Sequence, residues 1–279
     1  METKDLYSTY IANCVFNAFL SYTAIMLNIV TIHAIRKTVS LSKPLKTFLL
    51  SLGASDLGVG LFVQPLYIGQ LVMKLEQNTE SNSTFNTICI SIAYRTTAYL
   101  FAFASFFGVV ALSVDRFLAM YLHLRYQELV THKRVAAVVI SIWVLSAILS
   151  LVAFTNSENI DDVIRAIIAA ACIIITTFLN YKIYETVRRH ANQIQAFQVQ
   201  QPTQNEEMAN VGRLKKSAVT TAYVFLVFLV CYLPKSCTFW IKAIAHESST
   251  DIYVTELYFF TLVSSMVIEG MRPSVKIYD

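Results

Sequence analysis

Charged residues are scarce in this chain, and so are glycine and proline. Only 14% of its 279 residues are charged, whereas 56% are hydrophobic and the mean hydropathy is +0.54. Soluble domains usually carry about 25% charged residues, so this composition excludes a typical soluble enzyme, a coiled coil and a disordered chain. Seven glycines and five prolines exclude collagen-like and low-complexity material. The missing charged surface favours a protein whose solvent is lipid.

Signatures of metal, enzyme and nucleic-acid sites are missing as well. The five cysteines form no CxxC pair, so we expect no metal site. No HExxH, GxSxG or phosphate-binding glycine loop occurs, so we expect no catalytic residues and no enzyme. The net charge of +4 comes in short clusters between apolar runs instead of on one basic face. Such a pattern is typical of membrane topology and does not favour a nucleic-acid partner.

Seven apolar runs are long enough to cross a bilayer, because about 20 helical residues span its core. The predicted fold class is therefore all-α, a seven-transmembrane helix bundle that forms a single domain over 1–279. The expected spans cover 11–35, 45–73, 88–121, 135–154, 163–187, 217–245 and 252–278. A polar segment rich in Gln and Asn, 190–212, is expected to form a flexible third cytoplasmic loop.

Lysine and arginine collect in the loops that follow the first, third and fifth spans. Cytoplasmic loops carry this excess of basic residues, so the pattern predicts an extracellular N-terminus. The loop between the second and third spans holds the sequon Asn82-Ser83-Thr84, on the side predicted to be extracellular. We therefore expect a multi-pass plasma-membrane glycoprotein that carries its glycan on Asn82.

Ionisable groups inside the spans need a reason, since each costs at least ~2.5–3.5 kcal/mol at mid-bilayer. Asp56 in the second span either binds a cation, pairs across the bundle or stays protonated as a structural hydrogen-bonding group. Asp115 and Arg116 end the third span, as a functional pair or as a plain interfacial one. Pro234 kinks the sixth span, either as a hinge or as a static bend.

Taken in order, these residues resemble the rhodopsin-like (class A) family of G-protein-coupled receptors. The resemblance is carried by Asn28 in LNIV, Asp56 in LSLGASD, SVDRFLAMYLHLRY at the end of the third span, Trp143, Tyr181 in NYKIYETVRRH and CYLP in the sixth span. It implies a receptor that relays the binding of an extracellular ligand to a heterotrimeric G protein. The ligand itself stays unidentified.

The resemblance also implies roles for single residues. Arg116 would engage the G protein once the sixth span moves outward, and Asp115 would restrain it at rest. The other coupling and switch residues that it implies are Phe117, Tyr181, Phe228, Tyr232 and Pro234. Asp56 and Ser105 would belong to a sodium pocket, where Arg272 would replace the sodium ion with an internal ion pair. No other cofactor is expected.

For the ligand pocket, the resemblance argues against an amine, because Ala98 stands where amine receptors carry an aspartate. Candidate pocket residues are Tyr94, Arg95, Ala98, Tyr99 and Trp240. Core packing explains these aromatic side chains equally well, and Arg95 either meets an acidic ligand or reaches to the membrane surface. A peptide, a lipid and a nucleoside all remain open as ligands.

Departures from the family pattern leave two alternatives open. The loop 155–164 lacks the cysteine of the usual disulfide, and the fifth span lacks its usual proline, two features similar to the melanocortin branch. The seventh span ends in EGMRPSVKIYD where the family has NPxxY. The first alternative is a truncated or degenerate receptor that does not signal and only pairs with a full receptor, and the second is a channel or transporter. Membrane lipid and a second receptor molecule complete the expected partners.

Overall fold

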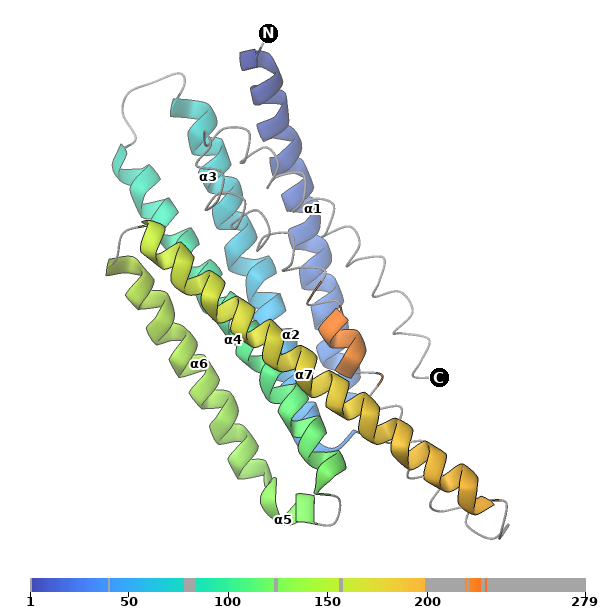
Figure 1. Ribbon diagram of the computed structural model, residues 1–279. Coiled ribbons are helices and arrows are strands. Elements are labelled where there is room, and N and C mark those ends of the chain that lie inside the picture. Colours follow the sequence, from blue (N-terminus) through green and yellow to red (C-terminus); the bar gives the residue numbers. More distant parts are fainter. Residues whose placement is uncertain are drawn as a thin grey trace.

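The computed structural model shows a bundle of long helices (Figure 1). It describes residues 2–39, 41–77, 84–122, 125–155 and 158–198, together with 219, 221–226 and 229. Within these residues the elements are α1 (Glu2–Lys37), α2 (Lys43–Gly58), η1 (Val59–Val63), α3 (Gln64–Gln77), α4 (Thr84–Tyr121), α5 (Tyr126–Leu129), α6 (His132–Thr155) and α7 (Glu158–Gln198). Every regular element of the described part is helical, which confirms the all-α fold class.

Five helical stretches of the described part are long and apolar enough to cross a membrane. They are Tyr10–Lys37, Lys43–Met73, Phe85–Tyr121, His132–Leu151 and Ile167–Arg189. These stretches overlap the first five expected spans. The sixth and seventh expected spans lie outside the described residues, apart from 219, 221–226 and 229.

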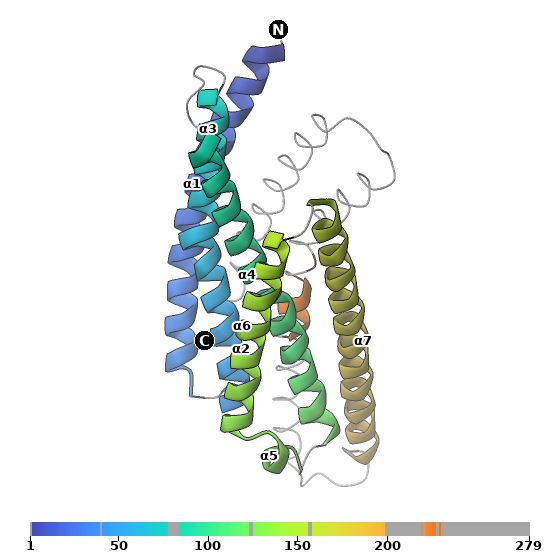
Figure 2. The same cartoon turned by 90° about the vertical axis from the view of Figure 1, so that its left-hand side faces the viewer.

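Helix α4 lies at the centre of the described bundle, in contact with α2, α3, α6 and α7 (Figures 1 and 2). In its most apolar window 56% of the residues are buried, against 22% for α1, α6 and α7. The main core cluster joins α2, α4, α6, α7 and the segment 221–226 through Leu45, Phe48, Leu52, Phe106, Val109, Leu112, Val135, Ala169, Cys172 and Phe225. The outer faces of the other helices are left exposed and apolar, as lipid contact requires.

The second span is one helical stretch with a widened turn in its middle. Pro65 lacks an N–H, and its ring would collide with the carbonyl one turn earlier in a regular α-helix. The π-turn of η1 ends two residues before this proline and opens the backbone there. Pro44 lies in the first turn of α2, where a missing N–H costs nothing. The two prolines therefore set where this stretch begins and where it bends.

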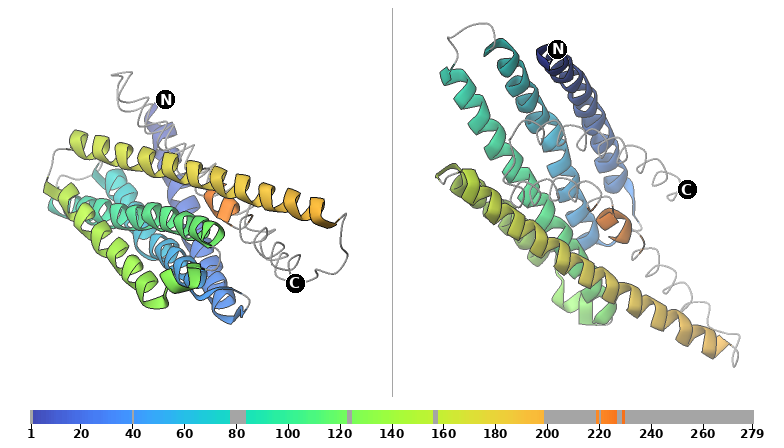
Figure 3. Two further views of the ribbon diagram at one scale, coloured as in Figure 1. Left: turned by 60° about the horizontal axis from the view of Figure 1, so that its bottom comes forward. Right: turned by 45° about the horizontal axis from the view of Figure 1, so that its top comes forward.

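Helix α7 extends well past the length needed to cross the bilayer. Its 41 residues span roughly 60 Å at 1.5 Å each, twice the thickness of the hydrocarbon core. Figures 1 and 3 show its C-terminal end projecting beyond the other helices. The expected loop at 190–212 thus starts too early, because residues 190–198 are helical. The segment HANQIQAFQ contains no glycine or proline to stop the helix, and Pro202 comes only later.

Close packing of α2 against α4 gives a first testable prediction. A Cβ atom added at Gly58 would lie 2.1 Å from Cε1 of Phe101. The Phe101 ring has little room to move, since it stacks on Phe62 and meets Trp143 edge to face. We expect Gly58→Ala to lower the free energy of unfolding by ~1–3 kcal/mol through overpacking. Thermal unfolding of the detergent-purified protein measures this.

Gly69→Ala is the matched control, because its added Cβ would meet Cγ2 of Ile90 at an ordinary 3.7 Å. Alanine favours a helix over glycine by ~0.8–1.0 kcal/mol, so this variant should be neutral or more stable. Equal melting temperatures for the two variants would contradict the packing described for Gly58.

Candidate functional site

A buried ion pair lies near the C-terminal end of α4, which faces inward in the orientation predicted from the sequence. The Asp115 and Arg116 residues are only 4% and 6% exposed. The Nε atom of Arg116 donates a hydrogen bond of 2.9 Å to Oδ2 of Asp115, and Nη2 donates to the same oxygen. Neighbouring residues of a helix normally point about 100° apart, so the guanidinium folds back along its own helix. The structure therefore brings together the two residues that the sequence singled out.

Two side chains from the adjoining loops complete this cluster. The Tyr126 hydroxyl of α5 donates a 2.7 Å hydrogen bond to Oδ1 of Asp115. The Nη2 atom of Arg116 also donates to Oγ of Ser42, which precedes α2, over 3.3 Å. Burial raises the pKa of Tyr126 above its ordinary value, and its hydrogen bond to the Asp115 carboxylate raises it further. We name Ser42, Asp115, Arg116 and Tyr126 the inner polar cluster.

The sequence interpretation missed Ser42 and Tyr126. Tyr126 was within reach, because it ends the stretch SVDRFLAMYLHLRY that was already singled out. A tyrosine about ten residues beyond a helix-ending aspartate can reach it when the chain turns back at once. Ser42 has no comparable signal, because its contact with Arg116 joins residues 74 positions apart.

Phe117 and Tyr181, two expected switch residues, occupy different environments. Phe117 packs against a small core of Met120 and Ile183, and its ring stacks on Tyr121 with the centroids 5.7 Å apart. Tyr181 is 61% exposed. Ile183, at 2% exposure, marks the inward face of α7, and two residues correspond to about 200° of helical turn. Tyr181 therefore points away from Arg116 and does not join the inner polar cluster.

The expected sodium pocket does not assemble from the described residues. The buried Ser105 hydroxyl lies 3.0 Å from the hydroxyl of Ser55, whereas Asp56 is exposed. Ser55 and Asp56 are consecutive on α2 and face different directions. Ser105 thus pairs with the residue before the expected one.

Trp143 ties α6 to the centre of the bundle. Its Nε1 donates a 3.0 Å hydrogen bond to Oγ of Ser51 on α2. Its ring meets Phe101 of α4 edge to face, with the centroids 6.0 Å apart. One side chain therefore holds three helices in register above the inner polar cluster.

The described members of the expected ligand pocket lie on the N-terminal half of α4. Tyr94 contacts Tyr67 of α3, with the ring centroids 5.5 Å apart and tilted by 37°. Tyr99 is buried, while Arg95 and Ala98 are half-buried. These side chains share one part of the bundle. Tyr67 is the aromatic partner that the sequence interpretation did not include.

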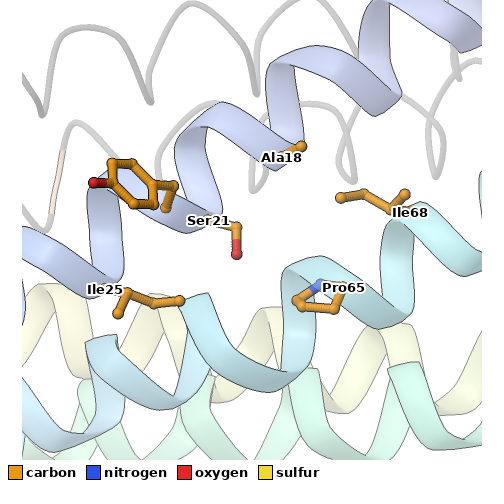
Figure 4. A pocket seen from close by; sticks show the side chains of 6 residues that line it. Ala18, Ser21, Ile25, Pro65 and Ile68 are labelled. Atoms are coloured by element: carbon orange, nitrogen blue, oxygen red, sulfur yellow. The ribbon is translucent and has the colours of Figure 1, made fainter.

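A separate groove lies between α1 and α3 (Figure 4). It has a volume of about 410 Å³ and is lined by Ala18, Ser21, Tyr22, Ile25, Pro65 and Ile68. The Ser21 hydroxyl already donates a 2.7 Å hydrogen bond to the Gly60 carbonyl in η1, so its proton is not available to a ligand in the groove. No charged side chain lines this groove, so it does not favour a charged ligand.

Six expected site residues lie outside the described part of the chain. They are Asn82, Phe228, Tyr232, Pro234, Trp240 and Arg272. Their roles in glycosylation, switching, ligand binding and ion pairing stay predictions.

Comparison with known proteins decides the family. The model of the family described as "7 transmembrane receptor (rhodopsin family)" matches residues 27–172, which is more than half of the chain. The chain belongs to this receptor family. The resemblance seen in the sequence is thereby confirmed, and the protein is a multi-pass membrane protein. The matched range includes the whole of α2 and α4, the inner polar cluster and Trp143.

Adenosine and melanocortin receptors are among the similar members of the family. The adenosine receptor A2b of Canis lupus familiaris is 32% identical over 58% of this chain and 44% of its own length. The Homo sapiens A2b receptor is 31% identical over the same shares. The melanocortin receptor 3 of Rattus norvegicus is 25% identical over 77% of this chain and 65% of its own. The match thus spans less than half the length of the A2b relatives.

The Tyr126 contact gives a second prediction. Tyr126→Phe removes a hydrogen bond to a buried carboxylate, worth ~1.5–3 kcal/mol. We expect a lower melting temperature in detergent. Tyr121→Phe is the matched control, because Tyr121 is 73% exposed and its ring stacking on Phe117 survives the change. If both variants melted at the wild-type temperature, Tyr126 would not support Asp115 as described.

Proposed function

We propose that this chain is a receptor that relays the binding of an extracellular ligand to a heterotrimeric G protein. The observation that carries the proposal is the inner polar cluster, where Arg116 is buried and paired with Asp115 at the end of the central helix. Asp115 and Arg116 are the buried charged residues of the described part, and they pair with each other. That arrangement favours a conformational switch over an ion path, which would need charges spread along the bundle.

The distribution of charge supports the orientation that this function needs. Arg36 and Lys37 end α1, and Lys43 begins α2. Lys133 and Arg134 lie in the first turn of α6, at the same end of the bundle as the inner polar cluster (Figure 1). Basic residues mark the cytoplasmic side, so we place this end in the cytoplasm. The N-terminus is then extracellular, and the protein lies in the plasma membrane.

The relay needs a change of population and no bond-breaking chemistry. In the resting state Arg116 is held by Asp115 and Ser42. Breaking a buried ion pair costs ~3–5 kcal/mol when one charge loses its partner. Tyr126 lowers that cost, because its hydrogen bond to Asp115 does not involve the arginine. A ligand that binds the open bundle more tightly, and a G protein that accepts the arginine, together shift the population.

The ligand belongs to one of two classes that the relatives suggest. Receptors similar to this chain are named for adenosine, a nucleoside, and for melanocortin, a peptide hormone. The Tyr67 and Tyr94 rings supply an aromatic surface on which a base or an aromatic side chain can stack. We propose this outer part of α3 and α4 as part of the ligand site and test both ligands.

Guanine-nucleotide exchange tests the proposal. The full chain in lipid nanodiscs, mixed with G-protein heterotrimers of several subtypes, should accelerate exchange above the protein-free rate, further still with adenosine or a melanocortin peptide. Arg116→Gln should reduce exchange to background, because glutamine cannot supply the cation. Arg188→Gln is the control, since Arg188 lies exposed on α7. A folded chain that never accelerates exchange would favour the non-signalling alternative. Ion flux across vesicles that contain the same purified protein would favour the channel.

A further inference from the structure

Ser42 forms a contact that its position in the fold does not require. It immediately precedes α2, where a serine hydroxyl usually accepts a hydrogen bond from a backbone N–H of the first turn. The Ser42 side chain makes no such bond. Its hydroxyl instead accepts a hydrogen bond from Nη2 of Arg116 over 3.3 Å. Ser42 as a residue is also exposed.

The surroundings of Ser42 are strongly basic. Arg36 and Lys37 end α1, and Lys43 and Lys46 lie in the first turn of α2. The Nζ atom of Lys46 donates a 2.6 Å hydrogen bond to the Arg36 carbonyl, which holds the two helix ends together. The acidic group of the inner polar cluster is Asp115, which already accepts hydrogen bonds from Arg116 and Tyr126. A dianion on Ser42 would therefore lie beside several cations.

We propose that Ser42 is a phosphorylation site and that Arg116 binds the phosphate. The enzyme would be a protein kinase that selects serines among basic residues, with ATP as the donor. The Ser42 Oγ atom forms a bond to the γ-phosphorus, the bond from that phosphorus to the β-phosphate oxygen breaks, and ADP leaves. The hydroxyl proton passes to a base of the kinase. The resulting phosphoserine carries about −1.5 to −2 charges and three acceptor oxygens.

The phosphate would hold Arg116 in its resting position. At present Arg116 gives Ser42 one long hydrogen bond to a neutral oxygen. A phosphate oxygen in that place forms a shorter, charge-assisted bond to the guanidinium. Asp115 shares the same guanidinium, but its Oδ1 keeps the Tyr126 hydroxyl as a partner. Since the proposed function requires Arg116 to reach the G protein, phosphorylation of Ser42 is expected to silence the receptor, and this last step rests on that function.

The phosphate contact can be tested without any signalling readout. Phosphoserine is incorporated at position 42 of the full chain, and the phosphate is titrated by ³¹P NMR in nanodiscs. We expect the midpoint of its second ionisation to lie roughly one pH unit lower with Arg116 than in Arg116→Gln, because a facing cation favours the dianion. Lys43→Gln is the matched control for a nearby exposed cation and should shift the midpoint less. Equal midpoints with Arg116 and with Gln at position 116, in variants that remain folded by thermal unfolding, would overturn the contact.

The modification itself has a separate test. The unmodified chain in nanodiscs is incubated with ATP and a kinase of basic specificity, and phosphopeptides are mapped by mass spectrometry. We expect phosphate on the peptide that contains Ser42 and its loss in Ser42→Ala, while Thr38→Ala keeps it. Phosphate found only at other residues would refute the modification site.

Nucleotide exchange then links the contact to function. The phosphoserine form should exchange more slowly than the unmodified chain, while Ser42→Ala should exchange at least as fast as the unmodified chain. An unchanged exchange rate, together with a shifted ³¹P midpoint, would overturn the silencing step alone. If no form accelerates exchange, the proposed function fails, and the ³¹P and mass-spectrometric results still decide whether Ser42 is modified and bound by Arg116.

Discussion

Two opposite charges lie buried at the inner end of the central helix, and their need for partners constrains everything around them. Taking a carboxylate and a guanidinium out of water costs several kcal/mol each, and their attraction offsets this only with good geometry and further hydrogen bonds. Asp115 and Arg116 obtain these from each other, from Tyr126 and from Ser42. Three segments are thereby held at one point: the end of α4, the short helix α5 that follows it, and the start of α2, which is 74 residues away from Arg116 in the sequence.

The rest of the bundle is held by small and polar contacts, as expected where lipid replaces water. Apolar side chains gain little by leaving lipid for another helix, so close approach and hydrogen bonds decide the packing. Serines supply many of these bonds, at the contacts Ser21–Gly60, Ser51–Trp143 and Ser55–Ser105. Glycines allow the close approach, as Gly58 does beneath the Phe101 ring. These contacts join α1, α2, α4 and α6 above the inner polar cluster.

Much of this architecture can be predicted from features of the amino-acid sequence. Long apolar runs predicted the helices, because a helix satisfies its backbone hydrogen bonds within a single segment in lipid. The neighbouring Asp115 and Arg116 predicted an inner ion pair, since a charge at that depth needs a partner. The failures are of another kind. The Ser42 contact depends on how the helices pack, and the Ser55–Ser105 pair depends on the rotation of α2 about its axis, which one residue changes by about 100°. Sequence order carries neither piece of information.

The two loop residues of the inner polar cluster act on opposite charges, and this separates two properties of the switch. Tyr126 donates its hydrogen bond to the carboxylate, so this bond can stabilise Asp115 after the arginine has left. The Ser42 hydroxyl accepts its hydrogen bond from the guanidinium, so this bond must break when Arg116 leaves. Tyr126 therefore lowers the cost of the open state, while Ser42 adds to the stability of the closed one. The balance between rest and activity is then set by two side chains outside the ion pair. A change at either can shift the population while Asp115 and Arg116 stay the same.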